Sequence, residues 1–340
     1  MFDRMVQHGD APTRHSAEST LNQMHRLANE RIQTFIDVLP ETVEPQKHRM
    51  VFDAQQKRQL HGPVARSEHE PPTADAVVNQ AFDGAGSMWD FLDQVFHRKS
   101  IDGHGMRLDA TVHYGTGFQN AMWNGYQLVC GDGDGHLLGS FTKCLAVIGH
   151  EYGHGLTQSV TALGYYGQTG ALNEHIADVV GMMLRQWAAR ETVDQSDWFI
   201  GGPLLGPGVT GRGIRSMADP GTAYDDAVLG RDPQPKHMDH YVETAADHGG
   251  VHINSGIPNH AFYLAAKAIG GFSWEVPGRI WYATLTERLT SDAIFDDLAR
   301  ATVDIAGERY GNGGDVQRAV ALAWDQVGID VPLFHRHRAV

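Results

Sequence analysis

Two histidines and a glutamate near residue 150 have the spacing of a metal-binding site. His150 and His154 lie four residues apart, so on an α-helix, with ~3.6 residues per turn, their side chains project from the same face. Glu151 stands beside them. The arrangement matches the H-E-x-x-H pattern, in which two imidazoles bind zinc and the glutamate acts on a zinc-bound water. The alternative is a helix with two solvent-exposed histidines in a chain that contains 20 of them.

A third ligand would decide between these interpretations, because a catalytic zinc needs three protein ligands and an open position. Glu174 follows His154 by 20 residues, enough for a loop and a return onto the first helix. Asp178, one turn further, shares a helical face with Glu174. One carboxylate can bind the metal while the other accepts the free N–H of a ligating histidine. The alternative, a solvated acidic edge, fits poorly with the apolar neighbours Ile176, Val179, Val180 and Met183.

The elements that must position these residues follow from hydrophobic patterning. Before the H-E-x-x-H helix we expect short strands and turns over 50–72, a helix over 73–96 interrupted at Gly84 and Gly86, and strands over 108–114 and 126–130. After it we expect helices near 172–189, 256–269, 276–289, 291–307 and 315–327, with a loop-rich stretch over 201–235. The pattern predicts an α+β fold, β-rich before the H-E-x-x-H helix and helical after it.

The first 49 residues look like a separate segment. They carry six basic and seven acidic residues, whereas the whole chain has a net charge of −14. Apolar residues recur at helical spacing, with Ser16 or Ser19 as N-caps, and the run Pro40–Pro45 reads as a linker. The residues of this apolar stripe are Leu21, Met24, Ala28, Ile32, Phe35 and Leu39. The alternative is an ordinary N-terminal helix of the main fold.

Composition limits the class of protein. A chain of 340 residues exceeds the ~250 to 300 at which single cores stop growing, so we expect two lobes. The charge of −14 argues against nucleic acid or an anionic membrane surface as partner. The sequence contains no run of about 18 apolar residues, so no membrane span is predicted. The N-terminus lacks a standard signal-peptide pattern, so we expect either secretion by a non-standard route or a cytoplasmic protein.

Two further features have alternative interpretations. Cys130 and Cys144 are too few for a disulfide framework and are either two buried thiols, which we favour, or one bridge. The run Gly131–Gly135 suggests a calcium loop. It lacks a third spaced acid, and Lys143 stands where an EF-hand has its glutamate, so a tight turn is expected.

Five sequence blocks together resemble the thermolysin-like zinc metallopeptidases, and within them the protealysin-like subgroup with short prosegments. They are Asn120–Gly125, the H-E-x-x-H block, Gly170–Asp178, Arg215–Pro220 and Asp247–Gly256. The resemblance implies a thermolysin-like two-lobe fold with the active-site cleft between a β-rich and an α-helical lobe. It implies a prosegment and linker over 1–49, an N-terminal lobe over 50–165 and a C-terminal lobe over 166–340.

The resemblance also assigns chemical roles. It implies one zinc ion bound by His150, His154 and Glu174, with Glu151 as the general base, and with Asp178 and Asn173 supporting the ligands. Tyr165 and His252 match residues that hydrogen-bond the oxyanion, and Asp247 matches the carboxylate that orients His252. These roles describe a neutral endopeptidase, made as a precursor and acting as a monomer.

Substrate-binding positions carry over in the same way. Asn120 and Ala121 match the edge segment that pairs with an extended peptide or protein substrate, and Arg215 matches a residue that binds a substrate carbonyl. Leu138, Val147 and Ile214 match the walls of an apolar S1′ pocket. We therefore expect cleavage on the amino side of bulky hydrophobic residues, with the chain's own prosegment as a second partner.

The sequence departs from the family pattern at three places. Ala146 and Arg185 stand where relatives have acidic residues that help to hold paired calcium ions, so we expect that double site to be missing. Gly153 within the H-E-x-x-H helix costs roughly 1 kcal/mol relative to alanine. The Pro-Pro-Tyr start of the subgroup's prosegment is also absent, which makes the inhibitory strength of residues 1–49 an open question.

Two other functions compete with the endopeptidase. An aminopeptidase would use a similar zinc site together with an acid for the substrate amine, but the corresponding edge, Asn120–Asn124, contains none. A latent zinc-binding interaction protein would not require Glu151. Both alternatives are weaker than the peptidase on these residues.

Overall fold

The structure is a computed structural model that describes residues 1–31 and 45–332. It begins with two packed helices, α1 (Phe2–His8) and α2 (Ala11–Arg31). The helix predicted to begin after Ser16 or Ser19 begins instead at Ala11, where Asp10 accepts a hydrogen bond from the N–H of Thr13. Ser16 and Ser19, predicted as caps, are instead buried inside α2. Most of the predicted linker and the last part of the apolar stripe, from Ile32, lie outside the described residues.

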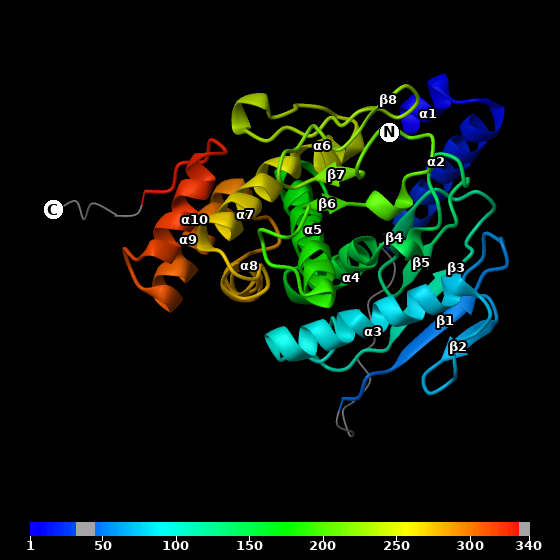
Figure 1. Ribbon diagram of the computed structural model, residues 1–340, viewed down its shortest axis with the longest axis horizontal. Coiled ribbons are helices and arrows are strands. Elements are labelled where there is room, and N and C mark those ends of the chain that lie inside the picture. The colour runs from blue at the N-terminus through cyan, green and yellow to red at the C-terminus, as the bar shows by residue number, and fades with distance from the viewer. Residues whose placement is uncertain (32–44, 333–340) are drawn as a thin grey trace.

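A five-stranded sheet with the order β2-β1-β3-β5-β4 forms the N-terminal part. Its strands are β1 (Arg49–Asp53), β2 (Val64–Ser67), β3 (Leu108–Val112), β4 (Ala121–Trp123) and β5 (Leu128–Cys130). The central pairs β1–β3 and β3–β5 are parallel, whereas β2 and β4 run antiparallel to their neighbours. Strand β4 therefore lies at one edge of the sheet, next to helix α4 (Figure 1).

Helix α3 (Ala76–Phe96) packs across the sheet without the predicted interruption. A Cβ atom at Gly84 would lie 2.5 Å from Cδ1 of Ile148, and one at Gly86 would lie 2.3 Å from Nη1 of Arg49. Both glycines permit close contacts rather than break the helix. The prediction was wrong because helix propensity is a weak preference that packing overrides.

Helices dominate the remainder of the chain, as predicted (Figure 1). They are α4 (Leu145–Val160), α5 (Gly167–Ala189), α6 (Asp247–Asn254), α7 (Gly256–Ile269), α8 (Val276–Glu287), α9 (Phe295–Tyr310) and α10 (Asp315–Asp325). Between α5 and α6 the chain forms only two-residue strands and short turns, namely β6 (Phe199–Ile200), β7 (Arg215–Ser216), β8 (Asp225–Asp226) and β9 (Gly230–Arg231). The predicted α+β fold with a β-rich first part and a helical second part is confirmed.

Helices α4 and α5 approach unusually closely because small residues face one another. A Cβ atom at Gly153 would lie 2.9 Å from Cα of Ala177, and one at Gly181 would lie 2.1 Å from the carbonyl oxygen of Ala146. The cost of Gly153 in a helix is thus explained by this packing. The close approach brings the side chains of the two helices into direct contact.

The two cysteines are buried thiols and the glycine-rich run is a turn, which are the interpretations that the sequence analysis favoured. Cys130 and Cys144 are both buried and free, and burial raises the pKa of each thiol. The 131–135 run forms a turn with Gly133 and Gly135 at positive φ of 69° and 73°. Asp134 there accepts hydrogen bonds from the backbone N–H groups of residues 136–138.

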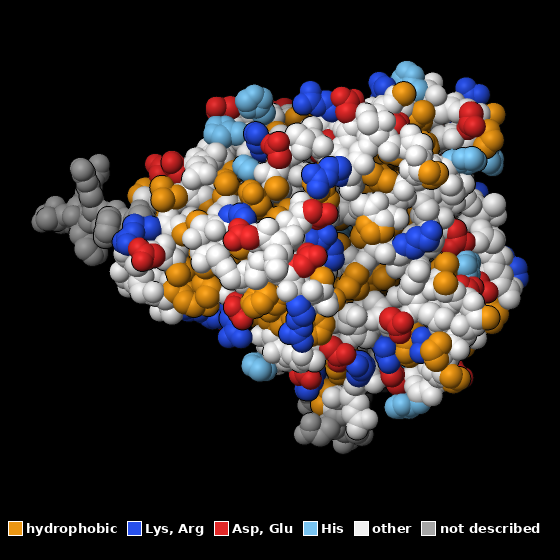
Figure 2. Space-filling model, in the orientation of Figure 1, with side chains coloured by type: hydrophobic (Ala, Val, Ile, Leu, Met, Phe, Trp, Pro, Cys, Tyr) orange, Lys and Arg blue, Asp and Glu red, His pale blue; other side chains and the backbone are white. Residues whose placement is uncertain are grey.

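The surface carries mixed charge. Figure 2 shows acidic and basic side chains interspersed over the face viewed, without a large patch of one sign. Among the helices that the structure describes, none is long and apolar enough to cross a membrane.

Candidate active site

Three buried side chains from α4 and α5 converge on one point. His150 and His154 come from α4 and Glu174 from α5, and one ligand atom of each lies within 4.8 Å of the others. The two Nε2 atoms are 3.1 Å apart, and each lies 3.4 Å from an oxygen of Glu174. Burial opposes ionisation of Glu174, but the charge of His252, the foremost of its basic neighbours, favours the carboxylate, and the pKa of Glu174 lies below its ordinary value. Two imidazole nitrogens and a carboxylate are a donor set that suits zinc.

The outer nitrogens of both imidazoles are held by hydrogen bonds. Nδ1 of His150 lies 2.7 Å from Oδ1 of Asp178, and Nδ1 of His154 lies 2.8 Å from Oδ1 of Asn173. Acceptors at these positions place the proton on Nδ1, which leaves the Nε2 lone pairs directed at the shared point. Both residues predicted to support the ligands are therefore in position to do so.

Asp178 is fully buried and lies at the centre of a polar network. Arg215, from β7, donates to it from Nε at 2.9 Å and from Nη2 at 2.7 Å, and Asn259 of α7 donates from Nδ2 at 2.9 Å. Burial favours the neutral carboxyl, but the charges of Arg215 and His150 hold the pKa of Asp178 well below its usual range. Arg215, predicted to bind substrate, lies against Asp178 with Nη2 3.5 Å from Nδ1 of His150.

Sequence reasoning missed Asn259. It lies on α7, far from the metal-binding motif in sequence, and its other amide atom, Oδ1, contacts Nδ1 of His175 at 2.8 Å. The only signal was an asparagine among the apolar residues of a helix that the pattern predicts to be buried. Such a residue must find a hydrogen-bond partner, but the sequence does not say which.

The backbone of the edge strand fixes Glu151. The N–H of Trp123 donates to Oε2 of Glu151 at 2.7 Å, while the indole Nε1 donates to Oε1 of Gln158 at 2.8 Å. Ala121 begins the same strand and pairs with Cys130, and Asn120 directly precedes it. The general base predicted from the sequence therefore lies beside the predicted substrate-binding edge.

Tyr165 and His252 contact the cluster at Glu174. The hydroxyl of Tyr165 contacts Glu174 and lies 3.3 Å from Nε2 of His252. Nδ1 of His252 lies 2.6 Å from Oδ1 of Asp247, whose Oδ2 accepts the backbone N–H of His252 at 2.9 Å. Desolvation opposes protonation of His252, but the charge of Glu174 and the hydrogen bond and charge of Asp247 outweigh it and raise its pKa to about 9. His252 is therefore a cationic donor at neutral pH.

A backbone bend in α6 presents His252. The segment Asp247–Gly250 has positive φ at all four residues, from 51° at His248 to 85° at Gly249. Gln234, which the sequence analysis did not predict, donates from Nε2 to the carbonyl oxygen of His252 at 2.8 Å and to Oγ of Ser255 at 3.2 Å. Both the bend and Gln234 fix the position of the imidazole.

The predicted walls of the apolar pocket belong to the main hydrophobic core. Leu138 and Val147 are buried, and Ile214 is partly buried against the same cluster. Gly201 adjoins this wall, since a Cβ atom there would lie 2.4 Å from Cγ1 of Ile214.

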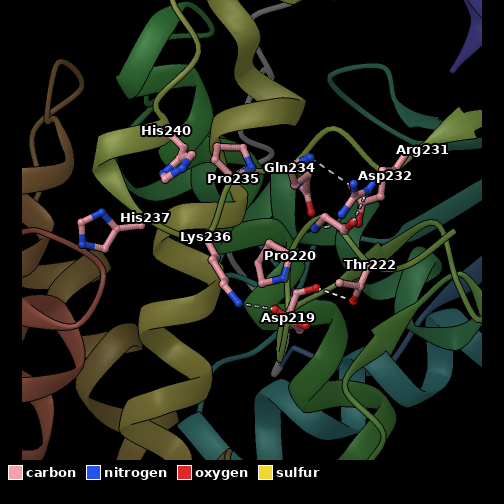
Figure 3. A pocket seen from close by; sticks show the side chains of 11 residues that line it. Asp219, Pro220, Thr222, Arg231, Asp232, Gln234, Pro235, Lys236, His237 and His240 are labelled. Atoms are coloured by element: carbon pink, nitrogen blue, oxygen red, sulfur yellow. Dashed lines mark hydrogen bonds and ion pairs between the residues drawn. The ribbon is translucent and has the colours of Figure 1, made fainter. Parts of the chain in front are cut away.

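An open cavity lies away from this cluster. A space of about 360 Å³ opens between the segments 219–222 and 231–237 (Figure 3). Lys236 crosses its mouth to Asp219 at 2.7 Å. None of the predicted site residues lines it, and Gln234 is the lining residue that also contacts His252.

Ala146 and Arg185, the two positions that depart from the calcium pattern, contact neighbouring residues of the chain. Ala146 packs against Gly181. Arg185 pairs with Asp197 at 2.8 Å and with Glu191 at 3.3 Å. A guanidinium group thus neutralises these carboxylates.

With this geometry described, comparison with known proteins identifies the class. Residues 41–158 match the model of the thermolysin metallopeptidase catalytic domain, and residues 161–329 match that of the thermolysin metallopeptidase α-helical domain. The chain belongs to the thermolysin metallopeptidase family and is a metalloendopeptidase. Family membership implies zinc, for which the cluster of His150, His154 and Glu174 is suited.

Individual relatives refine this assignment. The chain is 45% identical over 336 residues to an extracellular metalloprotease of Pectobacterium carotovorum subsp. carotovorum, covering 97% of this chain and 95% of that protein. It is 44% identical to protease PrtS of Photorhabdus sp. (strain Az29), covering 86% and 79% of the two chains. The precursor of protealysin, a metalloproteinase from Serratia proteamaculans, superposes with a TM-score of 0.88 at 43% identity over 96% of this chain and 97% of that one. The resemblance to the protealysin-like subgroup is confirmed, and the endopeptidase is favoured over the aminopeptidase and the latent binding protein.

Proposed function

We propose that this zinc endopeptidase hydrolyses peptide bonds on the amino side of bulky hydrophobic residues. The observation that carries the proposal is the position of Glu151, held by an edge strand beside a cluster of two imidazoles and a carboxylate. An ion-binding role alone would not require a second carboxylate between the cluster and the edge strand.

His150, His154 and Glu174 would hold the metal through two Nε2 atoms and one carboxylate. Zinc bound there would polarise the substrate carbonyl and bring the pKa of a bound water down to about 7. Glu151 then accepts the proton of the attacking water and passes it to the leaving amine. The N–H of Trp123 fixes the carboxylate for both transfers.

Tyr165 and His252 would act on the charge that develops on the carbonyl oxygen. Tyr165 contacts Glu174 and lies 3.3 Å from Nε2 of His252, and Asp247 orients the His252 imidazole through Nδ1. Removal of one such donor typically costs ~3 to 4 kcal/mol of transition-state stabilisation.

Substrate binding follows from the edge strand and the apolar wall. An extended peptide adds to the edge at Asn120 and Ala121 by main-chain hydrogen bonds. Leu138, Val147 and Ile214 accept the side chain that follows the cleaved bond, and Arg215 adds a donor for a substrate carbonyl. Arg185 and Ala146 stand at the paired calcium site, which this chain would lack, and the catalytic centre would hold one zinc ion.

Residues 1–49 act as the prosegment, removed by cleavage near residues 47–51. The extracellular relatives favour export of this chain as well. The lobes would span 50–165 and 166–340, and the enzyme would act as a monomer.

Cleavage-site mapping tests the proposal. An N-acetylated peptide with a single Leu in a Gly, Ser and Ala background is incubated with the zinc-loaded enzyme after prosegment removal, and the products are identified by mass. We expect cleavage directly before Leu, and replacement of that Leu by Asp should abolish it. Cleavage that requires a free N-terminus, or that ignores the Leu, would contradict the proposal.

A further inference from the structure

Helix α1 covers an apolar face of the catalytic part, that is, of the chain that follows residue 49. Met5 is fully buried in a hydrophobic cluster separate from the main core. Figure 1 shows α1 beside β8, although more than 200 residues separate them in sequence. The larger side chains that the catalytic part contributes to this cluster, which we call the α1-covered face, are Leu137, Phe199, Val209, Tyr224, Val228 and Leu229.

Helix α2 makes a second contact, which is polar. The hydroxyl of Ser16 donates to the carbonyl oxygen of Gly117, and Oγ1 of Thr20 accepts the backbone N–H of Gln119 at 3.0 Å. These two main-chain groups lie just before Asn120 of the substrate-binding edge. Side-chain hydroxyls of α2 therefore satisfy the kind of groups that an extended chain satisfies when it adds to a sheet edge.

Both contacts are continuous with the proposed S1′ pocket. Leu137 of the α1-covered face directly precedes Leu138 of the pocket wall. The N–H of Gly133, in the same loop, donates to the carbonyl of Phe118 at 3.1 Å, which ties this loop to the edge segment 117–119. Phe199 precedes Ile200, whose carbonyl oxygen accepts the N–H of Ile214 at 2.8 Å. The covered surface therefore adjoins both the wall of the proposed S1′ pocket and the edge segment.

We propose that, once the N-terminal segment is removed, this surface binds the stretch of substrate that follows the residue in the S1′ pocket. The inference rests on the proposed function. Gly117 and Gln119 offer hydrogen bonds to its main chain, and the α1-covered face takes the apolar side chains that follow along the extended substrate. The specificity of the enzyme is thus set at two places, the S1′ pocket and this distal face.

Removal of α1 supplies the driving force. A face of six apolar residues would otherwise be left in contact with water, and its burial by any apolar segment is favourable in proportion to the area covered. The substrate chain is the occupant that the geometry favours, because it is already held at the adjoining pocket and edge. A second copy of the enzyme has no such tether.

A pair of blocked peptides tests the proposal with the zinc-loaded enzyme after prosegment removal. Both have the same sequence up to the second residue after the cleaved bond and then continue as Leu-Phe-Leu or Ser-Gly-Ser. We expect KM to be about fivefold or more lower for the apolar peptide, from partial burial of its side chains, with kcat nearly unchanged. The double variant Val209→Ser/Val228→Ser should remove this difference. Val64→Ser, at a residue 53% exposed on β2, is the matched control and should retain it.

The outcomes separate this inference from the proposed function. Equal KM values for both peptides with the wild-type enzyme would overturn the proposal that the α1-covered face binds substrate. Hydrolysis of both peptides would still support the proposed endopeptidase. Hydrolysis of neither would overturn both. A dimer that Val209→Ser/Val228→Ser abolishes, together with equal KM values, would assign the face to a second copy and overturn the inference. Slower cleavage of both peptides by that variant to the same extent would show only a structural role and also contradict it.

Discussion

Helices α4 and α5 meet through glycines, whereas α2 meets the edge segment through hydroxyl groups. At the first contact a Cβ at Gly181 would lie 2.1 Å from a backbone oxygen, and the buried carboxylate of Asp178 has three partners. At the second, Oε1 of Gln23 and Oε1 of Gln119 are buried with no hydrogen-bond partner among the described residues. Such an atom typically costs ~1 to 3 kcal/mol. The α4–α5 contact therefore holds the active site together, whereas the contact of α2 with the edge segment is suited to release of the N-terminal segment.

The largest effect should come from the buried charge at the α4–α5 contact. Asp178→Ala leaves the partly buried Arg215 without its carboxylate and should lower the free energy of unfolding by about 3 kcal/mol. It also frees the imidazole of His150, so zinc affinity should fall roughly 10- to 100-fold. Denaturant unfolding and zinc titration measure the two effects.

A surface ion pair is the matched control. Asp219→Ala breaks the contact with Lys236, whose side chain is 56% exposed, and should cost no more than about 1 kcal/mol. Similar losses of unfolding free energy in Asp178→Ala and Asp219→Ala would mean that the network around Asp178 stabilises the protein no more than a surface ion pair does.

A methyl group at Gly181 tests the close approach of α4 and α5. The added Cβ meets the backbone of Ala146, which cannot move without shifting α4, so Gly181→Ala should destabilise the protein by about 1 to 3 kcal/mol. Gly208 has no atom within 4 Å of such a Cβ, and Gly208→Ala should stay within about 0.5 kcal/mol of wild type. Thermal unfolding of the Gly181→Ala and Gly208→Ala variants measures the difference. Equal stability of the two variants would refute the tight contact between α4 and α5.

An isosteric change at Thr20 addresses the releasable contact. Thr20→Val removes the acceptor of the Gln119 N–H and leaves that amide unpaired beneath α2, which should weaken the docking of the N-terminal segment by about 1 kcal/mol, or ~fivefold. Limited proteolysis of the full chain should cut the segment correspondingly faster. The enzyme obtained after removal has the wild-type sequence and must show wild-type activity. Unchanged cutting would show that the hydroxyl does not hold the segment.

The smallest effect concerns pH. His113 lies between Asp132 and Asp75, at 2.8 and 2.9 Å. The bond with Asp132, then that with Asp75, raises its pKa from 6.5 to about 9 against desolvation. Its contribution to stability is therefore fully present below pH 6.5 and is lost as pH rises through 9. His113→Gln should flatten the pH dependence of unfolding over this window. Since Asp132 belongs to the loop tied to the edge segment, hydrogen exchange there should rise first.

The central site was predictable because its spacing is local. Helical periodicity alone places His150 and His154 on one face, and Glu174 and Asp178 on another. Partners that depend on tertiary contact were not predictable in this way. Asn259 and Gln234 reach the site from distant elements, and nothing in their spacing relates them to it.

Glycine and serine account for the errors. Gly84 and Gly86 were taken to break α3, whereas each makes room for another side chain. Ser16 and Ser19 were taken as caps because both residue types and positions suited that role, but they are buried within α2. In both cases the residue serves a contact with a distant segment, which local propensity does not report.

Catalysis by Glu151 is the claim to test most directly. The zinc-loaded enzyme, after prosegment removal, is compared with Glu151→Gln on a blocked peptide containing one Leu, with zinc content measured for both. We expect kcat/KM to fall about 10²- to 10⁴-fold in the variant, with one zinc ion per chain retained in each. Equal activity of the two proteins, or loss of zinc from the variant alone, would contradict the role assigned to Glu151.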